Sequence, residues 1–170
     1  LVDRNQAKKF IYCWLYGGGD RLVGEIVDGG VREGKQIKKR FMDRLPAFAK
    51  LRNHIEKTVD TKGHLIGLDG RVLPVRSKHS ALNLLLQSAG AVVMKEATVQ
   101  LHTDLRDIPP SYVYQVAHIH DEIQLSVKLS IAEEVGKIAV GSIRIAGENL
   151  NLKVPLTGEY KVGANWRGTH

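Results

Sequence analysis

Residues 112–129 read YVYQVAHIHDEIQLSVKL, and this stretch decides the fold class. Tyr112 to Ala117 and Ile123 to Leu129 are rich in β-branched and aromatic residues, which favours extended strands. The segment between them, His118 to Glu122, is short and polar enough for a tight antiparallel corner. We therefore expect a β-hairpin that presents the sequence His-Asp-Glu at its turn.

The remaining pattern is mainly helical. Asp3 is a suitable N-cap for a first helix that ends at Gly17-Gly18-Gly19, because residues without a Cβ disfavour the helix interior. Further helices are predicted over 20–28, 31–44, 46 to about 59, 80 to about 103 and 131 to about 148. A second hairpin is predicted from 63–67 and 71–75 through the turn pair Asp69-Gly70, and a last strand over 154–162. The predicted fold class is therefore α+β.

Composition argues against a disordered chain and against a membrane protein, since 43% of the residues are hydrophobic and 25% are charged. No apolar run approaches the roughly 18 residues of a spanning helix. Cys13 is the single cysteine, so a reducing compartment is indicated. No signal peptide pattern follows Leu1, which suggests a start internal to a longer protein.

The formal net charge of +7 is unevenly distributed. Residues 1–57 carry 13 basic and 7 acidic side chains, residues 58–100 carry 5 and 3, and residues 101–170 carry 7 and 8. A phosphate-rich partner such as nucleic acid or nucleotide would be attracted to the first half of the chain, because each cation that meets a phosphate releases condensed counterions. An ordinary solvated surface explains the same charge equally well.

Four residues of the first helix, Arg4, Lys8, Tyr12 and Tyr16, recur at every fourth position and therefore share one stripe. In one interpretation the two cations hold a polyphosphate while the phenol rings meet a sugar and a base. In the other interpretation, the stripe is an ordinary surface on which the long cationic side chains extend over two half-buried tyrosines. Spacing alone slightly favours this second interpretation.

Asp121 and Glu122 form a pair of carboxylates next to apolar strands, where remaining ionised is costly without a compensating positive charge. A divalent cation would compensate them. Mg²⁺ takes oxygen ligands and usually keeps waters and substrate phosphates, so one or two carboxylates from this chain suffice. The commoner explanation of an isolated Asp-Glu pair is an exposed acidic turn.

The order of these features resembles the carboxy-terminal polymerase region of family A DNA polymerases, and most of all their phage replicative branch. The resemblance rests on Arg4-x3-Lys8-x3-Tyr12-x3-Tyr16-Gly17, on Gln87-Ser88-Ala89-Gly90-Ala91 in the long helix, and on His120-Asp121-Glu122. It extends over essentially the whole chain, because Leu68-Asp69-Gly70-Arg71, the segment from Arg76 through Asn83 to Ala91, and Asn165-Trp166 to His170 fit as well.

The resemblance implies a helical, basic fingers segment over 1–60 and a palm portion over 61–170, which carries the His-Asp-Glu hairpin. In the fingers it implies that Arg4 and the catalytic Lys8 hold the incoming triphosphate. It further implies that Tyr12 lies against the sugar of the nucleotide and that Tyr16 stands beside the nascent base pair.

In the palm, the resemblance implies that Asp121 ligates the catalytic Mg²⁺ ions, that Glu122 supports the metal site and that His120 lies near the primer end. It also implies minor-groove contacts to primer-template DNA from a polar stripe formed by His79, Asn83 and Gln87. The alternative for this stripe is the solvent edge of an otherwise apolar helix.

The implied function is part of a DNA-directed DNA polymerase that adds deoxynucleoside triphosphates to a DNA primer by a two-metal mechanism. In the family a further aspartate lies upstream of the fingers helix. The chain alone is therefore expected to be inactive and to need an N-terminal polymerase part, in the same chain or as a split subunit. We expect it in the cytoplasm, that of the host cell if a phage encodes it.

Two alternatives remain at this stage. A single-subunit phage-type RNA polymerase shares the fingers pattern, although serine usually follows His-Asp there instead of Glu122. A non-catalytic nucleic-acid-binding remnant would keep the basic helices without turnover. Three residues, Cys13, Trp14 and Trp166, are interpreted as packing residues without a chemical role, and His170 as a terminal residue that could approach the active site.

Overall fold

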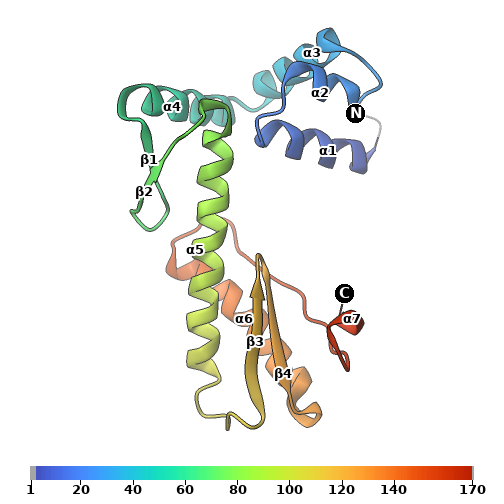
Figure 1. The fold of residues 1–170 in the computed structure, drawn as a ribbon, viewed down its shortest axis with the longest axis vertical. Coiled ribbons are helices and arrows are strands. Elements are labelled where there is room, and N and C mark those ends of the chain that lie inside the picture. Colours follow the sequence, from blue (N-terminus) through green and yellow to red (C-terminus); the bar gives the residue numbers. More distant parts are fainter. Residues whose placement is uncertain (1–2, 170) are drawn as a thin grey trace. The chain divides into compact units, whose positions relative to one another are not determined.

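The computed structural model describes residues 3–169, which form helices and two small antiparallel sheets (Figure 1). The helices are α1 (Arg4–Leu15), α2 (Asp20–Glu25), α3 (Val31–Arg44), α4 (Pro46–Lys62), α5 (Ala81–Asp104), α6 (Ala132–Asn149) and α7 (Trp166–Thr169). The strands are β1 (His64–Ile66), β2 (Val72–Pro74), β3 (Val113–Ile119) and β4 (Glu122–Val127), and the 3₁₀ turns are η1 (Lys78–Ser80) and η2 (Leu129–Ile131). The chain forms two compact units, one up to Ser88 and one from Ala89 onward, so α5 contributes to both.

A cluster of aromatic and apolar side chains joins α1, α2, α3 and α4 of the first unit. Phe10 and Trp14 of α1 are buried together with Val23 of α2. The Trp14 ring meets the edge of Phe41 at 4.9 Å between centroids and lies 5.4 Å from the Phe48 ring. Such offset and edge contacts stabilise the core beyond the apolar area that they bury. This core leaves the opposite face of α1 exposed.

The end of α1 is fixed by hydrogen bonds that use two glycines. Gly17 has a φ of 87°, in the left-handed region, and its N–H donates to the Trp14 carbonyl at 3.0 Å. The Gly18 N–H donates to the Cys13 carbonyl at 2.8 Å, which completes a Schellman motif. A Cβ on Gly17 would lie 2.7 Å from the carbonyl oxygen of His79, so only glycine allows α1 to approach η1 this closely.

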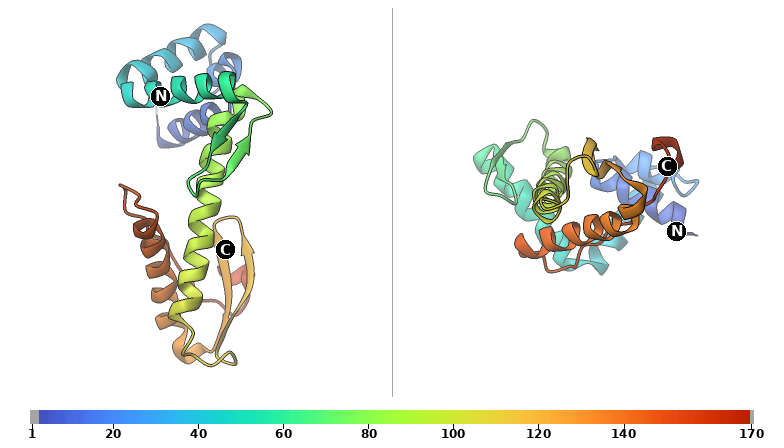
Figure 2. Two further views of the ribbon diagram at one scale, coloured as in Figure 1. Left: turned by 90° about the vertical axis from the view of Figure 1, so that its left-hand side faces the viewer. Right: turned by 90° about the horizontal axis from the view of Figure 1, so that it is seen from below.

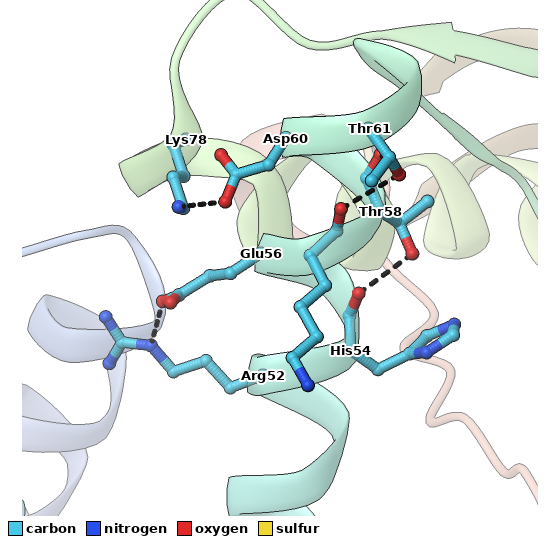
Figure 3. Close-up of polar contacts among 8 residues, drawn as sticks. Arg52, His54, Glu56, Thr58, Asp60, Thr61 and Lys78 are labelled. Atoms are coloured by element: carbon cyan, nitrogen blue, oxygen red, sulfur yellow. Dashed lines mark hydrogen bonds and ion pairs between the residues drawn. The ribbon is translucent and has the colours of Figure 1, made fainter.

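Polar contacts run along α4 and join it to η1 (Figure 3), and a cation–π contact joins it to α1. Lys78 Nζ lies 2.6 Å from Asp60 Oδ2, which fastens η1 to the last turns of α4. Arg52 Nε pairs with Glu56 Oε1 at 2.9 Å along α4, and the Arg52 guanidinium lies 5.5 Å from the centre of the Trp14 ring. The chain leading into α5 is thereby held against the end of α1.

The predicted hairpin within residues 61–75 is confirmed, since β1 and β2 pair antiparallel with Leu65 opposite Leu73. Its inner side packs on α4 and the start of α5 in a cluster formed by Ile55, Leu65, Leu73, Ala81 and Leu82. At the turn the side-chain hydrogen bond from Arg71 lowers the pKa of the Asp69 carboxyl below its ordinary value.

The second predicted hairpin is also confirmed. β3 and β4 pair antiparallel with Ile119 opposite Glu122, so that His120 and Asp121 form a two-residue turn. The hairpin and α6 lie on two sides of the C-terminal half of α5 (Figure 2). They share a core of Leu101, Leu105, Val113 and Val135. This packing supports the hairpin along its length and leaves the turn exposed.

The predicted strand over 154–162 is wrong, because residues 155–163 have no regular secondary structure. Within residues 3–169 the second sheet contains β3 and β4 alone, and the segment is held by side chains on α6 instead. The Tyr160 ring fills the space where Gly136 lacks a Cβ, and its hydroxyl donates to Glu133 Oε2 at 2.7 Å. Side-chain packing of this kind does not require a strand ladder.

The other predicted helices are confirmed with small shifts at their ends. α2 stops at Glu25 rather than near 28, because the chain reverses at Asp28, whose φ is 54°. The short α7 was not predicted. The division into a fingers segment over 1–60 and a palm portion over 61–170 concerns function and stays a prediction. Of the helices in residues 3–169, none combines the length and apolar character that a membrane span needs.

Candidate functional site

The predicted stripe of α1 is exposed along its full length. Asp3 caps the helix, since its Oδ1 accepts the Gln6 N–H at 2.7 Å. Arg4 and Lys8 project from the first half of α1, where the helix macrodipole is also positive. This half of the stripe therefore presents positive charge from side chains and from the backbone, which suits an anionic ligand.

The second half of the stripe carries two stacked phenol rings. The centroids of Tyr12 and Tyr16 are 6.1 Å apart and their planes differ by 11°. Lys8 Nζ lies 5.8 Å from the centre of the Tyr12 ring, a cation–π distance. The two tyrosines are 49% and 48% exposed, so part of each ring is open to solvent.

A hydrogen bond joins this stripe to the other predicted stripe of the first unit. Gln87 Nε2 on α5 donates to the Tyr16 hydroxyl at 2.9 Å, although 71 positions separate the two residues. Asn83 lies one turn before Gln87 on α5. His79 belongs to η1 rather than to the helix, which corrects the prediction that all three share one α-helix, but Gly17 contacts its backbone. Two candidate nucleotide- and DNA-binding groups therefore meet where α1 ends.

The His-Asp-Glu sequence lies at the tip of the β3–β4 hairpin in the second unit. His120 has a φ of 55°, in the region that favours glycine, and together with Asp121 it is exposed at the turn. Glu122 begins β4 and is half-buried. The tip therefore presents two adjacent carboxylates of unequal surroundings, one open to solvent and one held by neighbours.

Trp166 holds Glu122. Its Nε1 donates to Glu122 Oε1 at 3.0 Å, and Gln124 Nε2 donates to the same oxygen. The interpretation of Trp166 as a packing residue was wrong, since its indole is 50% exposed and acts as a donor. Sequence offers no spacing signal that links residues 44 positions apart. The same prediction named Trp14 and Cys13. Trp14 is buried, as expected, whereas Cys13 is half-buried, and burial raises the pKa of its thiol.

Carboxylate oxygens are the donors that Mg²⁺ prefers, so the chemistry of Asp121 and Glu122 fits that ion. Residues 3–169 contain no group of three His, Cys, Asp or Glu side chains placed to hold a metal. Further ligands would have to come from a substrate or from another polypeptide segment. His170 lies outside the described residues.

We predict that Trp166 and Glu122 stabilise the second unit jointly. In a double-mutant cycle of Trp166→Phe and Glu122→Ala, the coupling in the free energy of unfolding should be about 1 kcal/mol. A buried hydrogen bond to a charged group would contribute more, but solvent weakens this one because the indole is exposed. Urea unfolding followed by circular dichroism measures the coupling. Additive effects of the two substitutions would show that the contact contributes nothing.

Comparison with known proteins gives one consistent result. The model of DNA polymerase family A matches residues 2–168. The chain is 38% identical to the DNA-directed DNA polymerase of Enterobacteria phage T3 and 36% identical to that of Escherichia phage T7, in both cases over 100% of this chain and 27% of the relative. It thus spans about a quarter of the length of these relatives.

A solved structure shows the same fold. The POL domain of Pol1 from M. smegmatis, in complex with DNA primer-template and dNTP, matches with a TM-score of 0.73 and 17% sequence identity. The match covers 84% of this chain and 27% of that protein. The mixture of helices and small antiparallel sheets is therefore the arrangement found in a polymerase domain.

Proposed function

The chain belongs to DNA polymerase family A, and from that premise we propose that it forms part of a DNA-directed DNA polymerase. In this proposal it contributes the helix that binds the incoming deoxynucleoside triphosphate and one side of the metal site. The substrate is a DNA primer annealed to a template, whose 3′-hydroxyl is extended by nucleotidyl transfer.

The exposed stripe of α1 and its bond to α5 carry the proposal. We assign the triphosphate to Arg4 and Lys8, the sugar to Tyr12 and the base pair to Tyr16; the exposure of all four side chains on one stripe supports this assignment. We assign Tyr16 to the base pair and Gln87 to the minor groove. Gln87 donates a hydrogen bond to Tyr16, so these two residues are in direct contact. Asn83 and His79 extend the minor-groove surface.

We assign metal binding to Asp121 and Glu122, with His120 near the primer end. A bound Mg²⁺ would activate the primer hydroxyl and stabilise the leaving pyrophosphate. Asp121 is open to a ligand, whereas Glu122 is oriented by Trp166. The remaining ligands would come from the nucleotide and from the polymerase part that this chain does not include, in keeping with the 27% coverage of its phage relatives.

The family match does not favour a fragment of a single-subunit RNA polymerase. A non-catalytic remnant would bind DNA by the same basic helices and differs from our proposal only in turnover. If a phage encodes the chain, its place of action is the host cytoplasm, where phage DNA is copied.

A chimera tests the proposed function. The segment of the phage T7 relative that aligns with this chain is replaced by the chain, and primer extension is measured with Mg²⁺ and four nucleotides. We expect the chimera to extend the primer, and the 170-residue chain alone to bind primer-template DNA weakly without extending it. A folded chimera that binds DNA but does not extend it would favour the remnant, and extension by the chain alone would refute the dependence on a missing part.

A further inference from the structure

One face of α3 carries a concentration of positively charged side chains. Figure 1 shows the position of this helix in the first unit. The inner side of the helix packs into the aromatic core through Ile37, Phe41 and Met42. The opposite side is exposed and, apart from Val31 at the first position, consists of polar and charged residues, namely Arg32, Glu33, Lys35, Gln36, Lys39, Arg40, Asp43 and Arg44. We call Arg32, Lys35, Arg40 and Arg44 the α3 basic face.

The acidic side chains of α3 are engaged in local contacts. Glu33 Oε2 accepts the Gly30 N–H at 2.8 Å, and this backbone hydrogen bond lowers the pKa of Glu33. Asp43 Oδ2 pairs with Lys39 Nζ at 2.6 Å. Within residues 3–169 the four cations of the α3 basic face form no ion pair at 4.0 Å or less. Arg32 lies near enough to Glu33 to help lower the pKa of its carboxyl, but no acidic side chain in this part of the chain is bonded to any of the four.

Lys38, also on α3, has a structural role that the four cations of the α3 basic face lack. Lys38 turns inward, with 18% of its side chain exposed, and its Nζ lies 2.9 Å from Asp20 Oδ1 and 2.6 Å from the Gly18 carbonyl oxygen. Lys38 thus ties α3 to the loop after α1. The α3 basic face has no comparable role in holding the fold.

We propose that the α3 basic face binds the phosphate backbone of DNA, separately from the nucleotide-binding stripe of α1. The inference rests on the proposed function only in taking DNA as the partner. Arginine dominates the face, and its planar guanidinium suits paired contacts with phosphate oxygens. Three of the four cations, Arg32, Arg40 and Arg44, lie in one row of positions spaced by multiples of four, so a rigid helix presents them in line.

The composition of the face also indicates what it does not bind. It has no aromatic ring on which bases could stack, which favours contact with the sugar–phosphate backbone over sequence-selective contact with bases. An acidic protein segment is the competing partner for such a charge. Stable peptide docking normally uses buried apolar or aromatic anchors, and Val31 at the edge is the single apolar side chain exposed on α3.

The test uses the 170-residue chain and a primer-template duplex, with binding measured by fluorescence anisotropy at several salt concentrations. Replacing the α3 basic face with glutamine (Arg32, Lys35, Arg40 and Arg44→Gln) should weaken binding at least about tenfold in 0.1 M salt. The slope of log K against log salt should become shallower by about 0.9 for each DNA phosphate that the variant no longer neutralises. Glutamine has a helix propensity close to that of arginine and lysine, and circular dichroism checks that α3 is retained.

A matched variant removes four exposed cations from the second unit: Arg106, Lys137, Lys153 and Lys161→Gln. Its net charge equals that of the α3 variant, and we expect less than a twofold change in affinity. Equal reductions in affinity for both variants would attribute the effect to net charge and overturn the inference.

Two further outcomes separate the inference from the proposed function. If the unmodified chain fails to bind the duplex, the inference is overturned, whereas the proposed function is judged by primer extension in the chimera. If the unmodified chain binds and the α3 variant keeps both its affinity and its salt slope, the inference alone is overturned. A polyglutamate peptide that binds the unmodified chain but not the α3 variant, while DNA affinity stays unchanged, would identify an acidic protein segment as the partner and overturn it too.

Discussion

The chimera carrying Asp121→Asn is expected to extend a primer at least about 10³-fold more slowly than the unmodified chimera. Asp121 is exposed at a two-residue turn, and asparagine is well tolerated in turns, so the substitution removes a charge without disturbing the hairpin. A metal ion stabilises transition-state charge by several kcal/mol, and about 1.4 kcal/mol corresponds to a factor of ten in rate. Single-turnover extension at saturating Mg²⁺ and nucleotide measures the effect.

Asp107→Asn is the matched control for this prediction. Asp107 lies in the same unit, its side chain is 92% exposed, and the substitution removes the same charge. The control chimera should extend at the unmodified rate. Should the Asp121→Asn chimera match it, Asp121 would not be a metal ligand and the acidic turn would be an ordinary exposed one.

Local signals predicted most of the secondary structure. Helix α3 occupies the predicted residues 31–44, and α4 begins at Pro46, whose missing N–H costs nothing at a first helical position. α1 ends as predicted because Gly17 adopts a left-handed φ that terminates the helix. These features depend on residues close to one another in the sequence, so the sequence alone reveals them.

The failures involve contacts between residues far apart. The segment 154–162 has β-type residues, but its conformation is decided by Tyr160 packing against Gly136 on α6, which no local pattern indicates. The short α7 was missed for a similar reason, because its first residue, Trp166, is anchored by Glu122. Tertiary contacts outweigh local propensity at both places.

The candidate site shows the same division. Spacing predicted which residues of α1 share a stripe, since helical periodicity is local. It could not predict that Gln87 of α5 donates to Tyr16, nor that Glu122 is held by an indole. Residue types and periodicity therefore locate the candidate groups, whereas the partners that orient those groups are seen only in the folded chain.

Lys8→Ala in the chimera is expected to lower the rate of nucleotide incorporation on the order of 10²-fold. Lys8 is exposed on α1, and a cation directed at charge that grows on the phosphates stabilises the transition state more than the bound substrate. The reduction should therefore appear mainly in the maximal rate and less in nucleotide affinity. Rapid-quench kinetics over a range of nucleotide concentrations separates the two.

Two variants make this prediction specific to the position and charge of Lys8. Lys9→Ala removes an equal charge from the neighbouring exposed position, off the stripe, and should have little effect on the rate. Lys8→Arg keeps a cation that can still lie over the Tyr12 ring, whose centre is 5.8 Å from Lys8 Nζ, and should retain more activity than Lys8→Ala. If Lys8→Ala and Lys9→Ala reduced the rate equally, general attraction of nucleotide would account for both, and the α1 stripe would lose its assigned role in transition-state stabilisation.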